Sequence, residues 1–207
     1  MGRFFNPDNW FWRGFGRLAD YFLLSFCWFL TSAPIITVGT ASIALYDTVA
    51  HCVRGNEGNM FKRYFTTFKR ELKRGIALTV LWAVICFLLN AGYQVIVQMS
   101  GGSTGWTIFS IVYFVTLLIP LGILCWLIAL ESRFTYSFKD LHRTAFAFTL
   151  GYLPRTLVIV ALLVVVLNVL LNFPFFVMVL PAVMVNLQSV FIEKAFAKHM
   201  PEEETEV

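Results

Sequence analysis

Two long stretches of the chain, residues 76–130 and 156–192, contain no Asp, Glu, Lys or Arg. A helix needs roughly 20 apolar residues to cross about 30 Å of hydrocarbon, so each stretch is long enough to cross a membrane twice. Short polar turns at 99–105 and 172–174 divide the two stretches. The pattern therefore predicts membrane-spanning helices over 76–98, 106–130, 156–172 and 174–192.

A third apolar segment, residues 18–50, has its acidic residues only near its edges and contains Pro34 in the middle. Proline removes a backbone donor and breaks or kinks a helix. The segment is therefore either one long kinked span or two short helices folded as a hairpin. Because both flanking segments are basic, we favour the hairpin, spanning or re-entrant, which returns the chain to the side where it began.

Basic residues concentrate in the segments between the apolar ones, at 1–17, 51–75 and 131–155. By the positive-inside rule these segments lie in the cytoplasm. We therefore expect a multi-pass protein of the bacterial plasma membrane with both termini cytoplasmic. The expected fold is an all-α transmembrane bundle of about six hydrophobic segments, or five if 18–50 is one kinked span.

The expected organisation is a single membrane domain over 1–198, followed by a disordered acidic tail at 199–207. Within the domain, residues 1–17 read as an interfacial segment, because aromatic residues alternate there with arginines. Residues 54–75 read as a basic amphipathic helix on the cytoplasmic surface.

The composition agrees with an integral membrane protein, because 58% of residues are hydrophobic and the mean hydropathy is +0.74. The net charge of +4 includes four glutamates in the tail after Pro201, so the rest of the chain carries +8. These positive charges lie beside apolar spans. Anionic lipid headgroups or an acidic protein surface are therefore better partners than nucleic acid.

The basic helix at 54–75 is the sharpest local pattern, since aromatic residues recur in it at helical spacing and lysines and arginines fill the remaining positions. One interpretation is simple anchoring and control of topology. The other is a docking surface for a cytoplasmic or membrane partner. The candidate contact residues are Lys62, Arg63, Phe65, Phe68, Lys69 and Arg70.

Polar amides inside the predicted spans form a second pattern. Asn90, Gln94 and Gln98 are spaced at i, i+4 and i+8, so they share one face of a helix, and Asn168 and Asn172 do the same later in the chain. Amides in lipid need partners, so these faces should point into the bundle or towards another chain. Hydrogen bonding between helices is one interpretation, and a pathway lined for a polar solute is the other.

The sequence offers little for catalysis. The four cysteines show no paired spacing, and the three histidines are far apart with no metal-ligand pattern. Phosphate-binding and nucleophile-elbow motifs are absent from the sequence as well. We therefore expect a protein that is not an enzyme and has no metal and no cofactor.

In the N-terminal third, an apolar run ends in Pro34-Ile35-Ile36-Thr37-Val38-Gly39 and is followed by Ala44-Leu45-Tyr46 and then by Arg54, Glu57 and Gly58. With these residues, the segment from about 16 to 75 resembles the YesL-like family of bacterial integral membrane proteins, which has no assigned activity. Ser25 departs from the resemblance, because the family pattern has Asn there.

Members of that family are typically encoded beside carbohydrate ABC importers. The resemblance therefore implies a non-catalytic accessory membrane subunit of an oligosaccharide importer, whose membrane subunits would be its partners. Further candidate contact residues in the turn and the helix after it are Pro34, Thr37, Gly39 and Tyr46. The alternative is a small oligomeric transporter or channel for a polar solute, and a homo-oligomer is compatible with either function.

Overall fold

Over the residues that its structure, a computed structural model, describes (10–55, 58–99 and 104–198), the protein consists of helices joined by short turns and contains no strand. The all-α prediction is confirmed for these ranges. The elements are α1 (Trp10–Ser32), α2 (Val38–Thr48), the π-helix η1 (Val49–Arg54), α3 (Met60–Arg70), α4 (Leu72–Met99), α5 (Thr104–Thr116), α6 (Leu118–Arg133), α7 (Phe138–Gly151), α8 (Leu153–Asn172), the 3-10 helix η2 (Pro174–Met178) and α9 (Leu180–Phe196).

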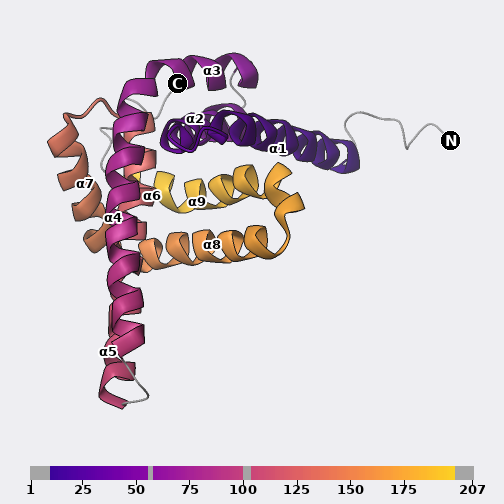
Figure 1. Cartoon of the computed structure of the whole chain (residues 1–207). Helices are drawn as coiled ribbons and strands as arrows, with labels where there is room; N and C mark the ends of the chain where they lie inside the picture. Colours follow the sequence, from indigo (N-terminus) through magenta and orange to yellow (C-terminus); the bar gives the residue numbers. More distant parts are fainter. Residues whose placement is uncertain (1–9, 56–57, 100–103, 199–207) are drawn as a thin grey trace.

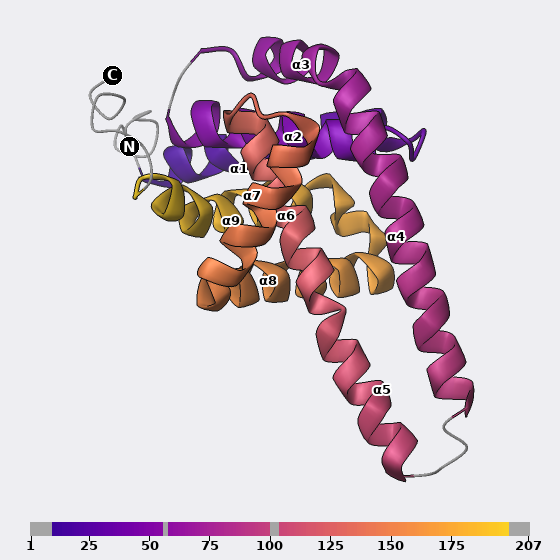
Figure 2. The same ribbon diagram turned by 90° about the vertical axis from the view of Figure 1, so that its left-hand side faces the viewer.

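The helices run in two main directions (Figure 1). Helices α1, α2, α8 and α9 are layered across the view, whereas α4 and α6 stand upright beside them and α3 lies across the top of α4. Figure 2 shows that α5 continues the line of α6 and, together with the far half of α4, extends beyond the other helices. We call residues 86–99 and 104–116 the α4–α5 arm.

Within the described residues, three helices are long and apolar enough to cross a membrane. They are Leu72–Met99, Gly105–Arg133 (α5 and α6 together) and Leu153–Asn172. This corrects the expectation of about six segments. Helices α2 and α9 contain 11 and 17 residues, or about 17 and 26 Å, and are too short to cross alone.

The segment 18–50 is a hairpin of two helices rather than one kinked helix. Helix α1 ends at Ser32, the chain turns around Pro34, and α2 packs back along α1, with Trp28 Nε1 donating to Ser42 Oγ at 3.2 Å. Thr37 Oγ1 donates to the carbonyl of Thr31 at 2.6 Å and closes the turn. Ile35 has a φ of 60°, a conformation that is strained for a β-branched residue.

Two glycines allow α2 and α4 to cross at close range. A Cβ atom on Gly39 would meet Thr79 Oγ1 and would lie 2.9 Å from the Gly75 carbonyl oxygen. A Cβ on Gly75 would lie 2.7 Å from the Thr40 Cα and would also meet the Thr40 hydroxyl. Because no side chain fits between the backbones, the Gly39 amide can donate to Thr79 Oγ1 at 2.9 Å. The small residues of α2 thus pack inside the chain.

The structure also shows how the predicted span at 106–130 and the segment 131–155 fold. The long span at 106–130 is interrupted at Leu117, where α5 ends and α6 begins, three residues before Pro120. The segment 131–155, expected as a cytoplasmic connection, contains the helix α7, which packs against α6. The acidic tail and residues 1–9 lie outside the described residues.

Candidate functional site: buried charges beneath a basic helix

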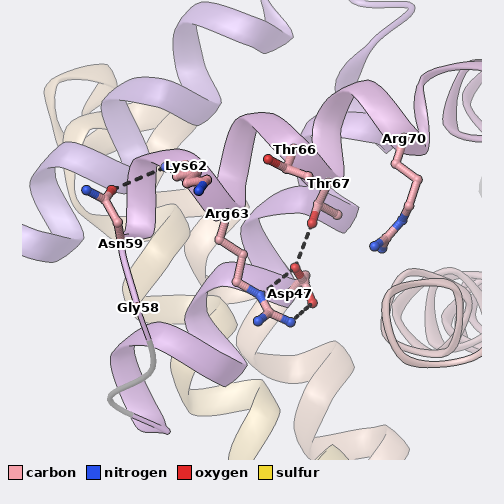
Figure 3. Close-up of a pocket in the computed structure, with 8 residues that line it drawn as sticks. All are labelled: Asp47, Gly58, Asn59, Lys62, Arg63, Thr66, Thr67 and Arg70. Atoms are coloured by element: carbon pink, nitrogen blue, oxygen red, sulfur yellow. Dashed lines mark hydrogen bonds and ion pairs between the residues drawn. The ribbon is translucent and has the colours of Figure 1, made fainter.

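Asp47, at the end of α2, is the centre of a charged cluster under α3. Its side chain is only 4% exposed. Arg63 donates to the two carboxylate oxygens from Nε at 2.9 Å and from Nη2 at 3.0 Å, and Thr67 Oγ1 donates at 2.7 Å (Figure 3). These bonds fix the face that α3 turns towards α2, and Tyr64 is buried on the same face.

The protonation of Asp47 is set by opposing effects. Burial raises the pKa of its carboxyl group, but hydrogen bonds from His51, Arg63 and Thr67, together with the positive charge of Arg63, outweigh burial. The net result is a pKa well below the ordinary value for aspartate. Asp47 is therefore ionised at neutral pH, and its charge is compensated inside the protein.

His51 connects this cluster to the rest of the bundle. Its Nδ1 lies 3.0 Å from the Asp47 carbonyl oxygen and 3.2 Å from Asp47 Oδ1, and its Nε2 lies 2.9 Å from Arg133 Nη1. A guanidinium group can only donate, so Nε2 must accept and Nδ1 must carry the proton. His51 is therefore bound as a neutral imidazole. It lies in the π-helix η1, a rare element often found at functional positions.

Arg133, at the end of α6, continues the network to α9. It forms a two-pronged ion pair with Glu193, from Nε to Oε1 at 3.2 Å and from Nη2 to Oε2 at 2.7 Å. The hydroxyl of Tyr46 donates to Glu193 Oε1 at 3.0 Å. Burial, and then the neighbouring Glu193 charge, raise the pKa of Tyr46 well above its ordinary value, so the hydroxyl stays protonated. The network thus joins α2, α3, η1, α6 and α9.

A separate pair lies where α4 begins. Arg74 Nη1 donates to Glu131 Oε1 at 3.1 Å, and Nη2 donates to the Tyr136 carbonyl at 3.1 Å. The other carboxylate oxygen of Glu131 is buried and has no hydrogen-bond partner within the described part of the chain. This pair connects the start of α4 to the end of α6, on the same side of the molecule as the Asp47 cluster.

A recess of about 390 Å³ opens beside the Asp47–Arg63 pair. Figure 3 shows Asp47 at its base, Lys62 near the beginning of α3 and Arg70 near the end. Asn59 caps α3, because its side-chain oxygen accepts from the Lys62 backbone amide at 3.2 Å. The lining residues are Asp47, Gly58, Asn59, Lys62, Arg63, Thr66, Thr67 and Arg70. Three of these residues (Lys62, Arg63 and Arg70) are cations and one (Asp47) is an anion, so the lining of the recess has a net positive charge.

The expected contact residues fall into two groups. Lys62, Phe65, Lys69 and Arg70 are exposed on α3, and Pro34 is exposed in the α1–α2 turn, so a partner can reach them. The others take part in contacts inside the chain or are partly covered. They are Tyr46, which is buried, Arg63, which is paired with Asp47, and Thr37, Gly39 and Phe68, which are half-buried. Contact of either group with a partner stays a prediction.

The amides expected on an inner face are exposed on this chain. Asn90, Gln94 and Gln98 lie on the outside of α4, and Asn168 and Asn172 lie on the outside of α8. The first expectation was that these faces point into the bundle. Within one chain they do not, because the side chains are exposed. Contact with another chain, the second direction, stays a prediction.

The described residues contain no group of three or more His, Cys, Asp and Glu side chains placed to hold a metal ion. The charged groups that are buried are instead paired with each other. Sequence reasoning missed His51, Arg133 and Glu193 as members of one network. The i, i+4 spacing of Asp47 and His51 was a usable signal, but nothing local links Arg133 with Glu193.

Residues 21–93 match the family model described as "Protein of unknown function, DUF624". No curated protein and no solved structure matches the chain. YesL is a member of the DUF624 family, so the match supports the resemblance at the level of this domain. The DUF624 region (residues 21–93) covers about a third of the chain.

The DUF624 region begins within α1, contains the turn at Pro34, α2, the Asp47 cluster and all of α3, and ends within α4. It therefore includes the recess and all of the expected contact residues. Arg133 and Glu193, which complete the charge network, lie outside it.

Proposed function

We propose that the protein is a non-catalytic accessory subunit in a bacterial plasma membrane, and that it binds the membrane subunits of a carbohydrate ABC importer. The observation that carries the docking part of this proposal is the outer face of α3. Its inner face is bound to α2 through Arg63 and Thr67 and to α1 through the Tyr64 hydroxyl, which lies 2.7 Å from Thr31 Oγ1. Lys62 and Lys69, in contrast, are exposed. The resemblance to YesL-like proteins supplies the class of partner.

A membrane location is supported by the surface of the α4–α5 arm. None of the described side chains of α5 is buried, and large apolar residues such as Phe109, Ile111 and Phe114 are about half exposed or more. Water would make such a surface costly, at about 25 cal/mol for each Å² of apolar area, whereas lipid would not. We place α4 and the continuous α5–α6 segment across the bilayer, so that the arm lies in the half of the bilayer away from α3. We place α3 on the cytoplasmic surface, because the lysines and arginines of α3 favour that side.

A non-catalytic role is supported by the way the buried charges are used. Asp47 is held in an ion pair with Arg63, and Glu193 in an ion pair with Arg133. Groups engaged in this way hold helices together and are not available to exchange protons with a substrate.

The test is affinity purification of the tagged protein from native membranes, followed by mass spectrometry. The expected result is recovery of importer membrane subunits. A variant with Lys62→Glu and Lys69→Glu should lose them, because its docking surface has reversed charge. The matched control, Lys139→Glu with Lys194→Glu, changes the same charge at exposed positions outside α3 and should keep them. Recovery of the wild-type protein without any importer subunit would contradict the proposal.

The second candidate is an oligomeric transporter for a polar solute. It is favoured by the exposed amides of α4, which can line a pathway only between chains. In proteoliposomes the wild-type protein should then move a sugar or an ion, and alanine at Asn90, Gln94 and Gln98 should abolish the flux. Absence of any flux from the wild-type protein would exclude this function.

A further inference from the structure

The amides of α4 point away from the rest of the chain. Helix α4 packs on α5 through the opposite side, where Tyr93 stacks on Tyr113 and the Tyr113 hydroxyl donates to the Leu89 carbonyl at 3.1 Å. At about 100° per residue, Gln94 lies on the far side of the helix from this contact. Figure 2 shows α4 at the edge of the molecule.

These amides also lack hydrogen bonds. Among the residues that the structure describes, the side chains of Asn90, Gln94 and Gln98 have no hydrogen-bond partner. The amides of α8 differ, because Asn172 Nδ2 donates to the Asn168 carbonyl at 2.8 Å within the same helix. The α4 amides are therefore the ones that need a partner from outside.

Their depth in a membrane makes the need stronger. If the hydrocarbon begins near Ile76, just after Lys73 and Arg74, a rise of 1.5 Å per residue puts Asn90 about 21 Å and Gln94 about 27 Å into it. Both positions lie within a hydrocarbon core of about 30 Å. Asn90 is then about 9 Å from the far edge of the hydrocarbon, at a depth where water is absent, so only another polar group in the membrane can satisfy it. Gln94 lies on the same face, near the far edge.

The pattern around the amides fits another helix. Ala83, Phe87, Asn90 and Gln94 are all exposed, and their spacing of four, three and four residues is that of a left-handed helix pair. Ala83 is small enough to let a second backbone approach. When such a face packs against a second helix, the polar residues at the contact positions fix the register between the two helices.

We propose that two copies of the chain associate in the bilayer through this face of α4, in parallel and around a two-fold axis along the membrane normal. A carboxamide carries both a donor and an acceptor, so each amide can bond to the same residue of the other copy. A parallel two-fold arrangement puts identical residues at identical depth. The dimer goes beyond the proposed importer function, and it rests only on the membrane location of α4.

The first test is disulfide cross-linking in membranes. Gln94→Cys is made in a background in which Cys86, the exposed cysteine of α4, is alanine. We expect a cross-linked dimer of this chain on oxidation. Ile111→Cys, at an exposed position of α5, is the matched control and should not cross-link. Equal cross-linking at both positions, or cross-linking only to a different protein, would overturn the proposal.

The second test replaces the amides with leucine. The triple variant Asn90→Leu, Gln94→Leu and Gln98→Leu should dimerise at least about tenfold more weakly in lipid nanodiscs or vesicles, measured by single-molecule photobleaching. The control Asn168→Leu with Asn172→Leu should dimerise like the wild type. Circular dichroism verifies that both variants are folded.

A wild-type protein that stays monomeric in the bilayer at every density, or a triple variant that dimerises as well as the wild type, would refute the dimer. Extraction with alkaline carbonate tests the membrane location separately. A monomer that resists extraction would therefore reject the dimer alone.

Discussion

Removal of the Arg63 side chain should destabilise the protein in a manner that depends on pH. In Arg63→Met the Asp47 carboxylate, which is 4% exposed, loses both bonds from the guanidinium group. Removing one partner of a buried ion pair costs about 3–5 kcal/mol. Thr67 and His51 still donate to Asp47, and Arg63 is itself 33% exposed, so we expect a loss of about 3 kcal/mol at pH 7.

The sign of the pH dependence follows from the pKa of Asp47. In the wild-type protein this pKa is lowered on folding, so the carboxylate contributes stability above the unfolded pKa of about 3.9 and loses it as the pH falls through the folded value. Without Arg63, burial is less strongly opposed and the folded pKa is higher. The variant therefore takes up its proton at higher pH, and its deficit relative to the wild type should shrink between pH 7 and pH 4.

The measurement is reversible unfolding in mixed micelles, followed by circular dichroism at both pH values. Lys69→Met, an exposed change on the same helix, should stay within about 0.5 kcal/mol of the wild type. The double variant Asp47→Asn with Arg63→Met should recover about 2 kcal/mol relative to Arg63→Met, because it leaves no unpaired charge. A deficit of the same size at pH 7 and pH 4 would refute this account of the cluster.

Three further changes test the packing. Gly75→Ala should cost about 1–3 kcal/mol because its Cβ would collide with Thr40, whereas Gly151→Ala, with nothing within 4 Å, should be neutral or stabilising in the same unfolding assay. Ile35→Gly should raise the melting temperature by removing roughly 1 kcal/mol of backbone strain, and a higher melting temperature for Ile36→Gly as well would argue against strain at Ile35. Tyr46→Phe should cost about 1 kcal/mol through loss of the bond to Glu193, while Tyr93→Phe, with no hydroxyl bond among the described residues, should unfold like the wild type.

The sequence predicts the long helices well, because charge-free runs bounded by basic residues leave little choice. Helix α4 was expected over 76–98 and extends from Leu72 to Met99, and the hairpin at Pro34 was the favoured alternative. Helix α7 was missed. The spacing of Leu141, Ala145 and Phe148 forms an apolar stripe that is typical of a helix. The basic residues of the same segment indicate only a cytoplasmic connection.

Other features depend on contacts that no local pattern encodes. Arg133 and Glu193 are 60 residues apart, and only the packing of α6 near α9 brings them together. Periodicity correctly put Asn90, Gln94 and Gln98 on one face of α4. It could not tell which face is turned outward, because α4 is apolar almost all around and either side could have packed on the bundle.

The different directions of α4 and α8 have a consequence for the proposed membrane placement. If α4 stands upright in the bilayer, α8 cannot also follow the membrane normal and is tilted towards the membrane plane (Figure 1). The molecule then occupies a wide cross-section in one leaflet, around α8 and α9, and only the narrow arm in the other. A body with this taper displaces more lipid from one leaflet than from its opposite, and it should therefore accumulate where the membrane is curved.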